Sequence, residues 1–245
     1  MSRHFIELGY QGANYAGFQI QKNANSIQHE VEQALKTVLR EPILLTCSSR
    51  TDAGVHAVSN YFHFDSKFST DIITGAKLLS SLNALLPGDI VIHKIYKVPA
   101  DQHSRFSAKS REYHYFIYQS KNPFLFDRAC FYPYKLNLQK LNEAAGVLME
   151  YQDFSSFSKK NTQVKSFECH IFKSEWFVEK DTFIYTVRAN RFLRGMVKGL
   201  VGTMLKVGTG KISLQNFREI IESKDSSQAN FAVPSKGLFL IKVEY

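Results

Sequence analysis

The fold is organised around one polar stretch, Ser48-Ser49-Arg50-Thr51-Asp52-Ala53-Gly54-Val55-His56-Ala57. An apolar run at 43–45 precedes it and a run of alternating polarity at 58–64 follows it, so two predicted strands flank a loop. Asp52 has a cation two residues earlier and Ala-Gly after it, which suits a nucleophile or a ligand anchor. A side-chain-to-backbone turn made by Thr51 and Asp52 explains the same residues. The spacing leaves both interpretations open.

The first half of the chain reads strand, helix, strand, strand, helix, strand. Strands are predicted at 5–8, 43–45, 58–64 and 90–98, and helices at 27–38, with Ser26 as N-cap, and at 71–86. An exposed polar-aromatic loop at 9–17, rich in glycine, follows the first strand.

The second half nearly repeats this order. We expect strands at 111–118, 167–178, 183–189 and 238–245, and helices at 138–149, 191–207 and 214–222. This is the split βαβ order of ferredoxin-like folds. We therefore expect an α+β fold with two halves, 1–108 and 109–245, that share a mixed, mostly antiparallel sheet and leave a cleft at their junction.

Composition narrows the functional classes. The 245 residues include 44% hydrophobic residues and carry a formal net charge of +9, which favours a polyanionic partner. No apolar segment reaches the roughly 18 to 20 residues needed to span a bilayer, so we expect a cytoplasmic protein without membrane contact. Three separated cysteines, Cys47, Cys130 and Cys169, predict buried thiols rather than a disulfide framework or a zinc site. No phosphate-binding glycine loop or metal-ligand histidine spacing occurs.

Two groups of basic residues suggest a surface for RNA. Arg191, Arg194 and Lys198 fall at i, i+3 and i+7 of a predicted helix, which predicts a cationic stripe opposite its apolar face. Gly195, Gly199 and Gly202 in the same segment suggest that something approaches the helix closely. An ordinary solvated face is the alternative.

The second basic group consists of Arg105, Lys109 and Arg111, and leads into a strand that contains Tyr113. Cations beside aromatic rings suit phosphate contact and base stacking. Cross-strand packing is the alternative for the tyrosines of this strand.

The block Arg50-Thr51-Asp52-Ala53-Gly54-Val55-His56-Ala57 closely resembles the catalytic-aspartate signature of the TruA-type tRNA pseudouridine synthases. Further blocks occur in the order typical of that family across nearly all of the chain: Asn83-Ala84, Leu86-Pro87-Gly88-Asp89-Ile90, Arg105-Phe106-Ser107-Ala108, Arg111 with Tyr113, Asp153-Phe154 with Ser156-Phe157, Met196-Val197 with Val201-Gly202, and Gly237-Leu238.

The resemblance implies a pseudouridine-synthase fold and a cofactor-free, metal-free isomerisation of uridine at positions 38, 39 and 40 of the tRNA anticodon stem-loop. It maps the nucleophile onto Asp52, the tyrosine that packs on the target base onto Tyr113, and the basic partner of the aspartate onto Lys198. Arg50 is the other candidate counter-charge. It also implies a homodimer that cradles tRNA. A carboxylate can form a covalent adduct and then depart, which suits this chemistry.

Four positions differ from the usual family pattern: Gln11 replaces Asp, Phe18 replaces Trp, Ser49 replaces Gly and Lys198 replaces Arg. Two other functions are alternatives. A catalytically inactive tRNA-binding protein would keep the basic groups, and intact Asp52 argues against it. A glycosidase would need a second carboxylate, and the sequence offers no obvious partner for Asp52.

Overall fold

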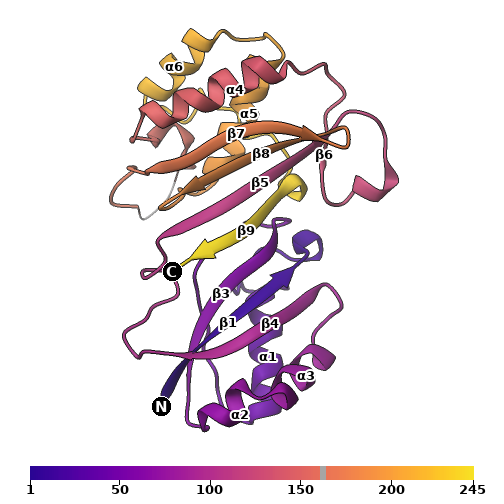
Figure 1. Ribbon diagram of the computed structural model, residues 1–245, viewed down its shortest axis with the longest axis vertical. Helices are drawn as coiled ribbons and strands as arrows, with labels where there is room; N and C mark the ends of the chain where they lie inside the picture. Colours follow the sequence, from indigo (N-terminus) through magenta and orange to yellow (C-terminus); the bar gives the residue numbers. More distant parts are fainter. Residues whose placement is uncertain (161–163) are drawn as a thin grey trace. The chain divides into compact units, whose positions relative to one another are not determined.

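The computed structural model describes residues 1–160 and 164–245, and Figure 1 shows its helices and strands. The Asp52 loop lies between β2 (Thr46–Cys47) and β3 (His56–Ser66). The chain divides into two compact units, one formed by Met1–Lys109 with Phe239–Tyr245 and the other by Ser110–Leu238. The expected boundary after residue 108 lies within one residue of this division. The last strand differs from expectation, because Phe239–Tyr245 belongs to the first unit rather than to the second.

The sheet of the first unit has the strand order β4 (Ile90–Val98), β1 (Ser2–Tyr10), β3, β2, and all of these pairs are antiparallel. This is the order expected for a ferredoxin-like fold, and the predicted α+β class is confirmed. β9 (Leu238–Glu244) adds a short parallel pairing at the start of β3, where His56 lies opposite Phe239. The pairing ties the residue that follows the Asp52 loop to the end of the chain.

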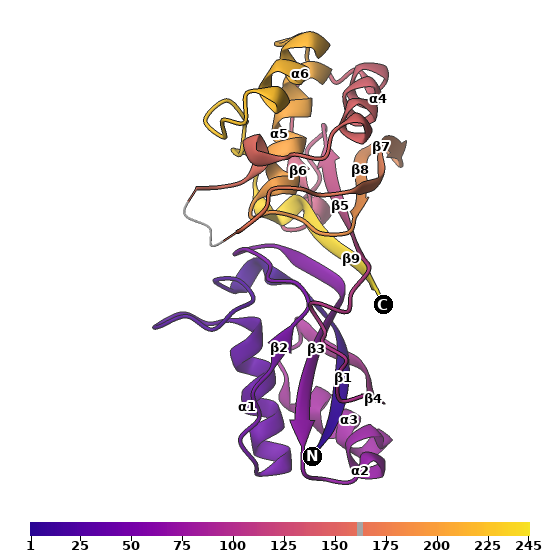
Figure 2. The same cartoon turned by 90° about the vertical axis from the view of Figure 1, so that its left-hand side faces the viewer.

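Helix α1 (Ile27–Leu39) begins where the sequence predicts. The Ser26 side chain accepts a hydrogen bond from His29 N, and Arg40 ends the helix in the left-handed conformation. Val31 and Leu35 lie fully buried on the apolar face. Figure 2 shows α1 alongside β2 and β3.

Two predicted elements of this unit are wrong. The strand expected at 43–45 is irregular, because helix side chains bind its backbone: Leu45 N donates to Glu32 Oε1 (2.9 Å), and Gln28 Nε2 donates to Leu45 O (3.1 Å). The single helix expected at 71–86 is two, α2 (Thr70–Thr74) and α3 (Ala76–Leu85), because Gly75 between them is extended. A 3-10 turn, η1 (Gly12–Asn14), follows β1.

The second unit has the strand path β5 (Ser110–Tyr118), β8 (Thr182–Ala189), β7 (Ile171–Glu179), all antiparallel, with β6 (Cys130–Phe131) parallel to β5. Lys180 and Asp181 both have positive φ, 46° and 61°, as the tight turn of the β7–β8 hairpin requires. β7 begins four residues later than the predicted start at 167.

Helices α4 (Leu138–Val147), α5 (Met196–Gly208) and α6 (Leu214–Glu222) pack together, and α4 covers β7 (Figure 1). Short 3-10 turns complete the unit at η2 (Pro123–Leu125), η3 (Leu148–Glu150), η4 (Ser155–Phe157) and η5 (Ser235–Gly237). The three cysteines are buried free thiols, as predicted. No helix within the described residues is long and apolar enough to cross a membrane.

Candidate active-site loop and basic segments

The Asp52 loop closes through a tight turn. Val55 N donates to Asp52 O (3.2 Å), and Gly54 in the third position has φ of 76°, a conformation that favours glycine. Asp52 is half-buried, whereas Thr51 and Val55 are buried. The turn therefore fixes the loop by its backbone and leaves the carboxylate accessible.

The glycine-rich loop that follows β1 packs against this turn. Phe18 N donates to Thr51 O (3.1 Å), and Gly12 N donates to His56 Nδ1 (3.2 Å). A Cβ on Gly17, which has φ of 114°, would lie 3.0 Å from Thr51 O, and a Cβ on Gly12 would overlap the Val55 carbonyl. The backbone of the loop after β1 therefore contacts the backbone of the Asp52 loop at Gly12 and Gly17, where a side chain would not fit. The expectation of an exposed polar-aromatic loop holds for its polar residues Gln11 and Asn14, which are exposed, and is wrong for Tyr10 and Tyr15, which are buried.

A buried polar network holds the other side of the loop. Tyr10 Oη lies 2.8 Å from Thr51 Oγ1, and Asn60 Nδ2 donates both to Tyr10 Oη (3.2 Å) and to Ser49 O (3.0 Å). Asn60 is fully buried on β3. Sequence reasoning missed Tyr10 and Asn60, although an asparagine on the apolar face of the predicted strand was an available signal.

Two of the predicted cations, Arg50 and Arg105, lie close to one buried thiol. Burial raises the pKa of the Cys47 thiol, and the Arg50 and Arg105 guanidinium groups nearby act in the opposite direction. Both arginines are exposed. Lys109 is also exposed and is held through its backbone, which donates to Glu244 O (2.7 Å). The first unit therefore brings Arg50 and Arg105 close to one thiol, that of Cys47.

The other predicted site residues belong to the second unit. Tyr113 on β5 is 9% exposed and packs edge-on against Phe192, with ring centroids 5.0 Å apart. Arg111 is equally buried, and its Nη1 donates to Asn190 O (2.9 Å). Arg111 is thus packed into its unit rather than displayed on an exposed basic cluster. Tyr115 and Tyr118 on the same strand are buried, as the packing alternative predicts.

The predicted cationic stripe on one helix is wrong. Helix α5 begins at Met196, because Gly195 before it has φ of 74°, so Arg191 and Arg194 lie in the preceding irregular segment. Arg194 is exposed and Arg191 half-buried. Lys198 does lie on α5, where its Nζ donates to Ser235 Oγ (3.3 Å). The three cations share a segment but not a helical face.

What approaches α5 closely is the protein itself. A Cβ on Gly202 would overlap the Asn230 carbonyl, and one on Gly199 would lie 2.8 Å from the Phe231 ring. Asn230 N donates to Thr203 Oγ1 (3.0 Å) in the same contact. These two glycines are therefore explained by packing and say nothing about RNA.

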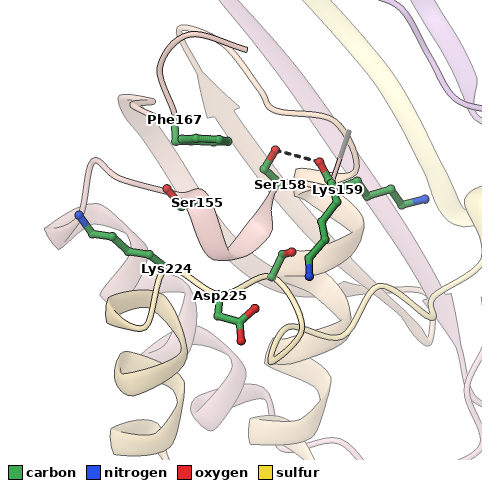
Figure 3. Close-up of a pocket in the computed structure, with 8 residues that line it drawn as sticks. Ser155, Ser158, Lys159, Phe167, Lys224 and Asp225 are labelled. Atoms are coloured by element: carbon green, nitrogen blue, oxygen red, sulfur yellow. Dashed lines mark hydrogen bonds between the residues drawn. The ribbon is translucent and has the colours of Figure 1, made fainter. Parts of the chain in front are cut away.

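A hollow of 390 Å³ lies beside the Arg191–Lys198 segment (Figure 3), lined by Ser155, Ser158, Lys159, Lys160, Phe167, Lys224, Asp225 and Ser226. Lys159 N donates to Arg194 O (3.0 Å), which joins the hollow to that segment. Lys224 Nζ pairs with Asp153 Oδ2 at 2.9 Å, and hydrogen bonds from Ser227 hold the pKa of Asp225 below its usual range. The hollow therefore carries mixed charge and selects no single class of ligand. Among the described residues no acidic, histidine or cysteine cluster could hold a metal ion.

Comparison with known proteins defines the class. Residues 150–245 match the family model described as tRNA pseudouridine synthase. The chain is 44% identical to "tRNA pseudouridine synthase A" of Parabacteroides distasonis, over 100% of this chain and 96% of that protein. It is 44% identical to the protein of the same name from Porphyromonas gingivalis (100% and 98% covered) and 39% identical to that from Bacillus licheniformis (97% of each).

The α+β fold and these relatives together identify the class of protein. It is an isomerase that modifies tRNA, a tRNA pseudouridine synthase. Within this class the chain belongs to the tRNA pseudouridine synthase A family. The expectation that the sequence resemblance raised is thereby confirmed at the level of family and reaction class.

Proposed function

We propose that the chain converts uridine to pseudouridine in the anticodon stem-loop of tRNA, at positions 38 to 40, with the Asp52 carboxylate as nucleophile. The observation that carries this proposal is the Asp52 loop. Two glycines and a buried Tyr10–Asn60 network position its backbone, while Asp52 itself stays half-buried and accessible. Such fixed placement is what a nucleophile needs in order to meet a flipped base reproducibly.

The reaction conserves all atoms of the nucleotide. Asp52 forms a covalent adduct, the bond between N1 of uracil and C1′ of the ribose breaks, and the uracil turns. A bond from C5 to C1′ then forms, the C5 proton is lost to a base, N1 gains a proton, and the carboxylate departs. The adduct forms at C1′ of the ribose or at C6 of the uracil. A carboxylate that attacks and then departs allows an isomerisation, whereas an activated water would hydrolyse the glycosidic bond.

The other predicted site residues also have roles in the proposed mechanism. The Tyr113 ring packs on the target uracil, and Lys198 supplies positive charge to the aspartate; the family resemblance supports both roles. Arg50, Arg105, Lys109, Arg191 and Arg194 contact phosphates, which the net charge of +9 supports. Arg111 acts through packing in its unit, since its side chain is buried.

The proposed setting is a cytoplasmic homodimer that binds one tRNA across two subunits. Sedimentation of the purified protein, alone and with tRNA, tests this assembly. A monomer at working concentration contradicts it.

Mapping pseudouridine in unmodified tRNA after incubation with the purified protein tests the substrate assignment. We expect modification at positions 38, 39 or 40 and nowhere else in the molecule. Pseudouridine confined to another stem would contradict the assignment while leaving the reaction class intact.

A further inference from the structure

An exposed aromatic ring projects from a rigid turn of the first unit. Phe106 is 76% exposed, although a single exposed apolar residue is by itself unremarkable. The turn at 103–107 is closed by reciprocal bonds: His103 N donates to Ser107 Oγ (3.0 Å), and Ser107 N donates to His103 O (2.9 Å). His103 Nδ1 accepts from both Arg105 N (3.1 Å) and Phe106 N (3.3 Å). Four hydrogen bonds therefore hold the backbone of the turn that carries Phe106.

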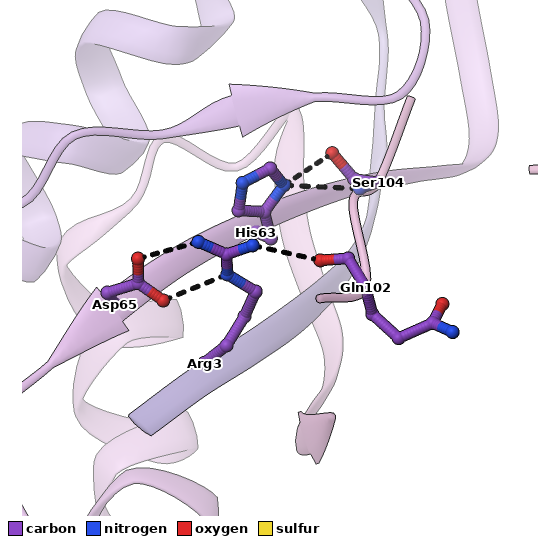
Figure 4. Close-up of polar contacts among 5 residues, drawn as sticks. All are labelled: Arg3, His63, Asp65, Gln102 and Ser104. Atoms are coloured by element: carbon purple, nitrogen blue, oxygen red, sulfur yellow. Dashed lines mark hydrogen bonds and ion pairs between the residues drawn. The ribbon is translucent and has the colours of Figure 1, made fainter. Parts of the chain in front are cut away.

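Ser104 anchors this turn to three separate parts of the unit. Its Oγ donates to Thr46 O (2.7 Å), its N donates to His63 Nδ1 (3.2 Å), and its carbonyl accepts from Tyr245 Oη (2.7 Å). Figure 4 shows Ser104 against His63, with Arg3 bridging Asp65 and Gln102 beside them. Ser104 and His63 are buried, so the anchor lies in the core.

A series of aromatic ring contacts continues from the turn into the core. Phe106 contacts His103 at 4.4 Å between centroids, His103 contacts His63 at 4.6 Å, and His63 stacks on Phe5 at 6.3 Å. The Arg105 guanidinium carbon lies 5.5 Å from the centroid of the Phe106 ring. Phe106 is thus the exposed end of a series of contacting aromatic rings, and the Arg105 guanidinium lies over its ring.

We propose that Phe106 and Arg105 bind one unpaired nucleotide of the tRNA, the ring by stacking on the base and the guanidinium by contacting its phosphate. An aromatic platform next to a cation is the combination that proteins use for unstacked bases. Because the ring is held before RNA arrives, binding costs little conformational entropy.

The position of the turn and its charge favour RNA as the occupant over a second copy of the chain. Arg105 shares the neighbourhood of Cys47 with Arg50, which lies two residues before Asp52. The turn that carries Phe106 therefore lies where two cations of the first unit gather around Cys47. The Arg105 guanidinium over the ring complements a polyanion and would oppose an equally basic copy of this protein.

Phe106 variants separate stacking from simple apolar contact. Phe106→Ala and Phe106→Leu should each raise KM and the Kd for tRNA about tenfold, within the range found when one base stack is removed. Phe106→Tyr should keep wild-type values. Single-turnover rates at saturating tRNA should stay within about twofold in all three, because saturation compensates for weaker binding. Phe124→Ala is the matched control, since Phe124 is also exposed (82%), and it should change nothing.

Three results would overturn the inference. In the first, Phe106→Leu binds tRNA as tightly as wild type, which would mean that the ring is not a stacking surface. In the second, Phe106→Ala shifts the sedimentation of the free protein without altering the Kd for tRNA, which would assign the ring to an interface between copies. In the third, all variants bind with the wild-type Kd.

This inference rests on the proposed tRNA substrate, but the readouts differ. A wild-type protein that forms no pseudouridine would contradict the proposed function. The effect of Phe106 on tRNA binding would still be measurable in that case.

Discussion

The Asp52 loop and the Arg191–Lys198 segment are both short, polar and rich in function-bearing residue types, yet they are built in opposite ways. The Asp52 loop is held by backbone-to-backbone contact with the 11–18 loop and by a buried Tyr10–Asn60 network. In the Arg191–Lys198 segment, the backbone of Arg194 accepts from Lys159, and Arg194 points its side chain to solvent. The first arrangement fixes the backbone that carries the proposed nucleophile, whereas the second exposes a positive charge to solvent.

Two of the departures from the family pattern lie in or beside the Asp52 loop. Phe18 replaces the usual tryptophan under the Asp52 loop and remains fully buried, so the support is kept with a smaller ring. Ser49 replaces glycine and is also buried, in the same loop. With both residues present, the turn that carries Asp52 keeps its Val55 N to Asp52 O hydrogen bond, while the buried Ser49 Oγ has no hydrogen-bond partner among the described residues.

The largest effect should come from removing the backbone contact under Asp52. Gly12→Ala places a methyl group where the Val55 carbonyl lies, so the loop must move. We expect turnover to fall at least about 100-fold, as displacements of about 1 Å can cause, with a lower melting temperature. The matched control is Gly146→Ala in α4, where no atom lies within 4 Å of the added Cβ. It should stabilise the protein by about 0.5 to 1 kcal/mol. Full activity of Gly12→Ala would contradict the claim that the contact between Gly12 and Val55 positions the Asp52 loop.

Removal of the charge on α5 should have the next largest effect. Lys198→Ala should lower the single-turnover rate by at least about tenfold, while Lys198→Arg should retain most of it, because a guanidinium keeps the charge but needs more room. Measuring both variants at saturating tRNA excludes an effect on binding. Equal rates for Lys198→Ala and wild type would remove Lys198 from the chemistry.

Arg191 and Arg194 should affect the affinity for tRNA rather than the rate of pseudouridine formation. In the Arg191→Gln/Arg194→Gln double variant, the slope of log K against log salt should flatten by roughly 0.7 to 0.9 for each phosphate that the protein no longer neutralises. Arg128→Gln/Lys173→Gln is a suitable control, since both cations are exposed and already paired with carboxylates. If the two double variants show the same slope, the segment is an ordinary solvated surface.

The sequence predicted the elements that local patterns control. The alternation along β3 and the Ser26 cap of α1 place both elements correctly, and the resemblance around Asp52 leads to the family. It could not predict elements that depend on tertiary contacts. Gln28 and Glu32 bind the backbone where a strand was expected, and the left-handed Gly195 sets the start of α5. The sequence does not show what Gly12 and Gly17 contact, so the packing of their loop against the Asp52 loop was not predicted.

The smallest effect concerns the anchor of the Phe106 turn and its dependence on pH. Burial lowers the pKa of His63 to about 4, with the charges of Arg3 and His103 acting in the same direction. The unfolded chain takes up this proton near pH 6.5 and the folded chain does not, so stability should fall as pH drops from about 6.5 to about 4.

Urea unfolding between pH 7 and pH 4 checks this dependence. His63→Asn should be less stable at pH 7, where its anchor is removed, but its stability should fall less steeply over this range. His29→Asn, on the exposed side of α1, should follow the wild-type curve. If His63→Asn keeps the wild-type slope, another group controls the acid limb.

The proposed mechanism depends most on Asp52, which must act as the nucleophile while other residues carry tRNA binding. Asp52→Asn keeps the size of the side chain and removes its charge, so single-turnover formation of pseudouridine and the Kd for tRNA can be compared in one pair of proteins. We predict no detectable pseudouridine from Asp52→Asn, with a Kd within about threefold of wild type, because phosphate contacts dominate affinity. Measurable turnover by an Asp52→Asn preparation free of wild-type enzyme would contradict this role for Asp52.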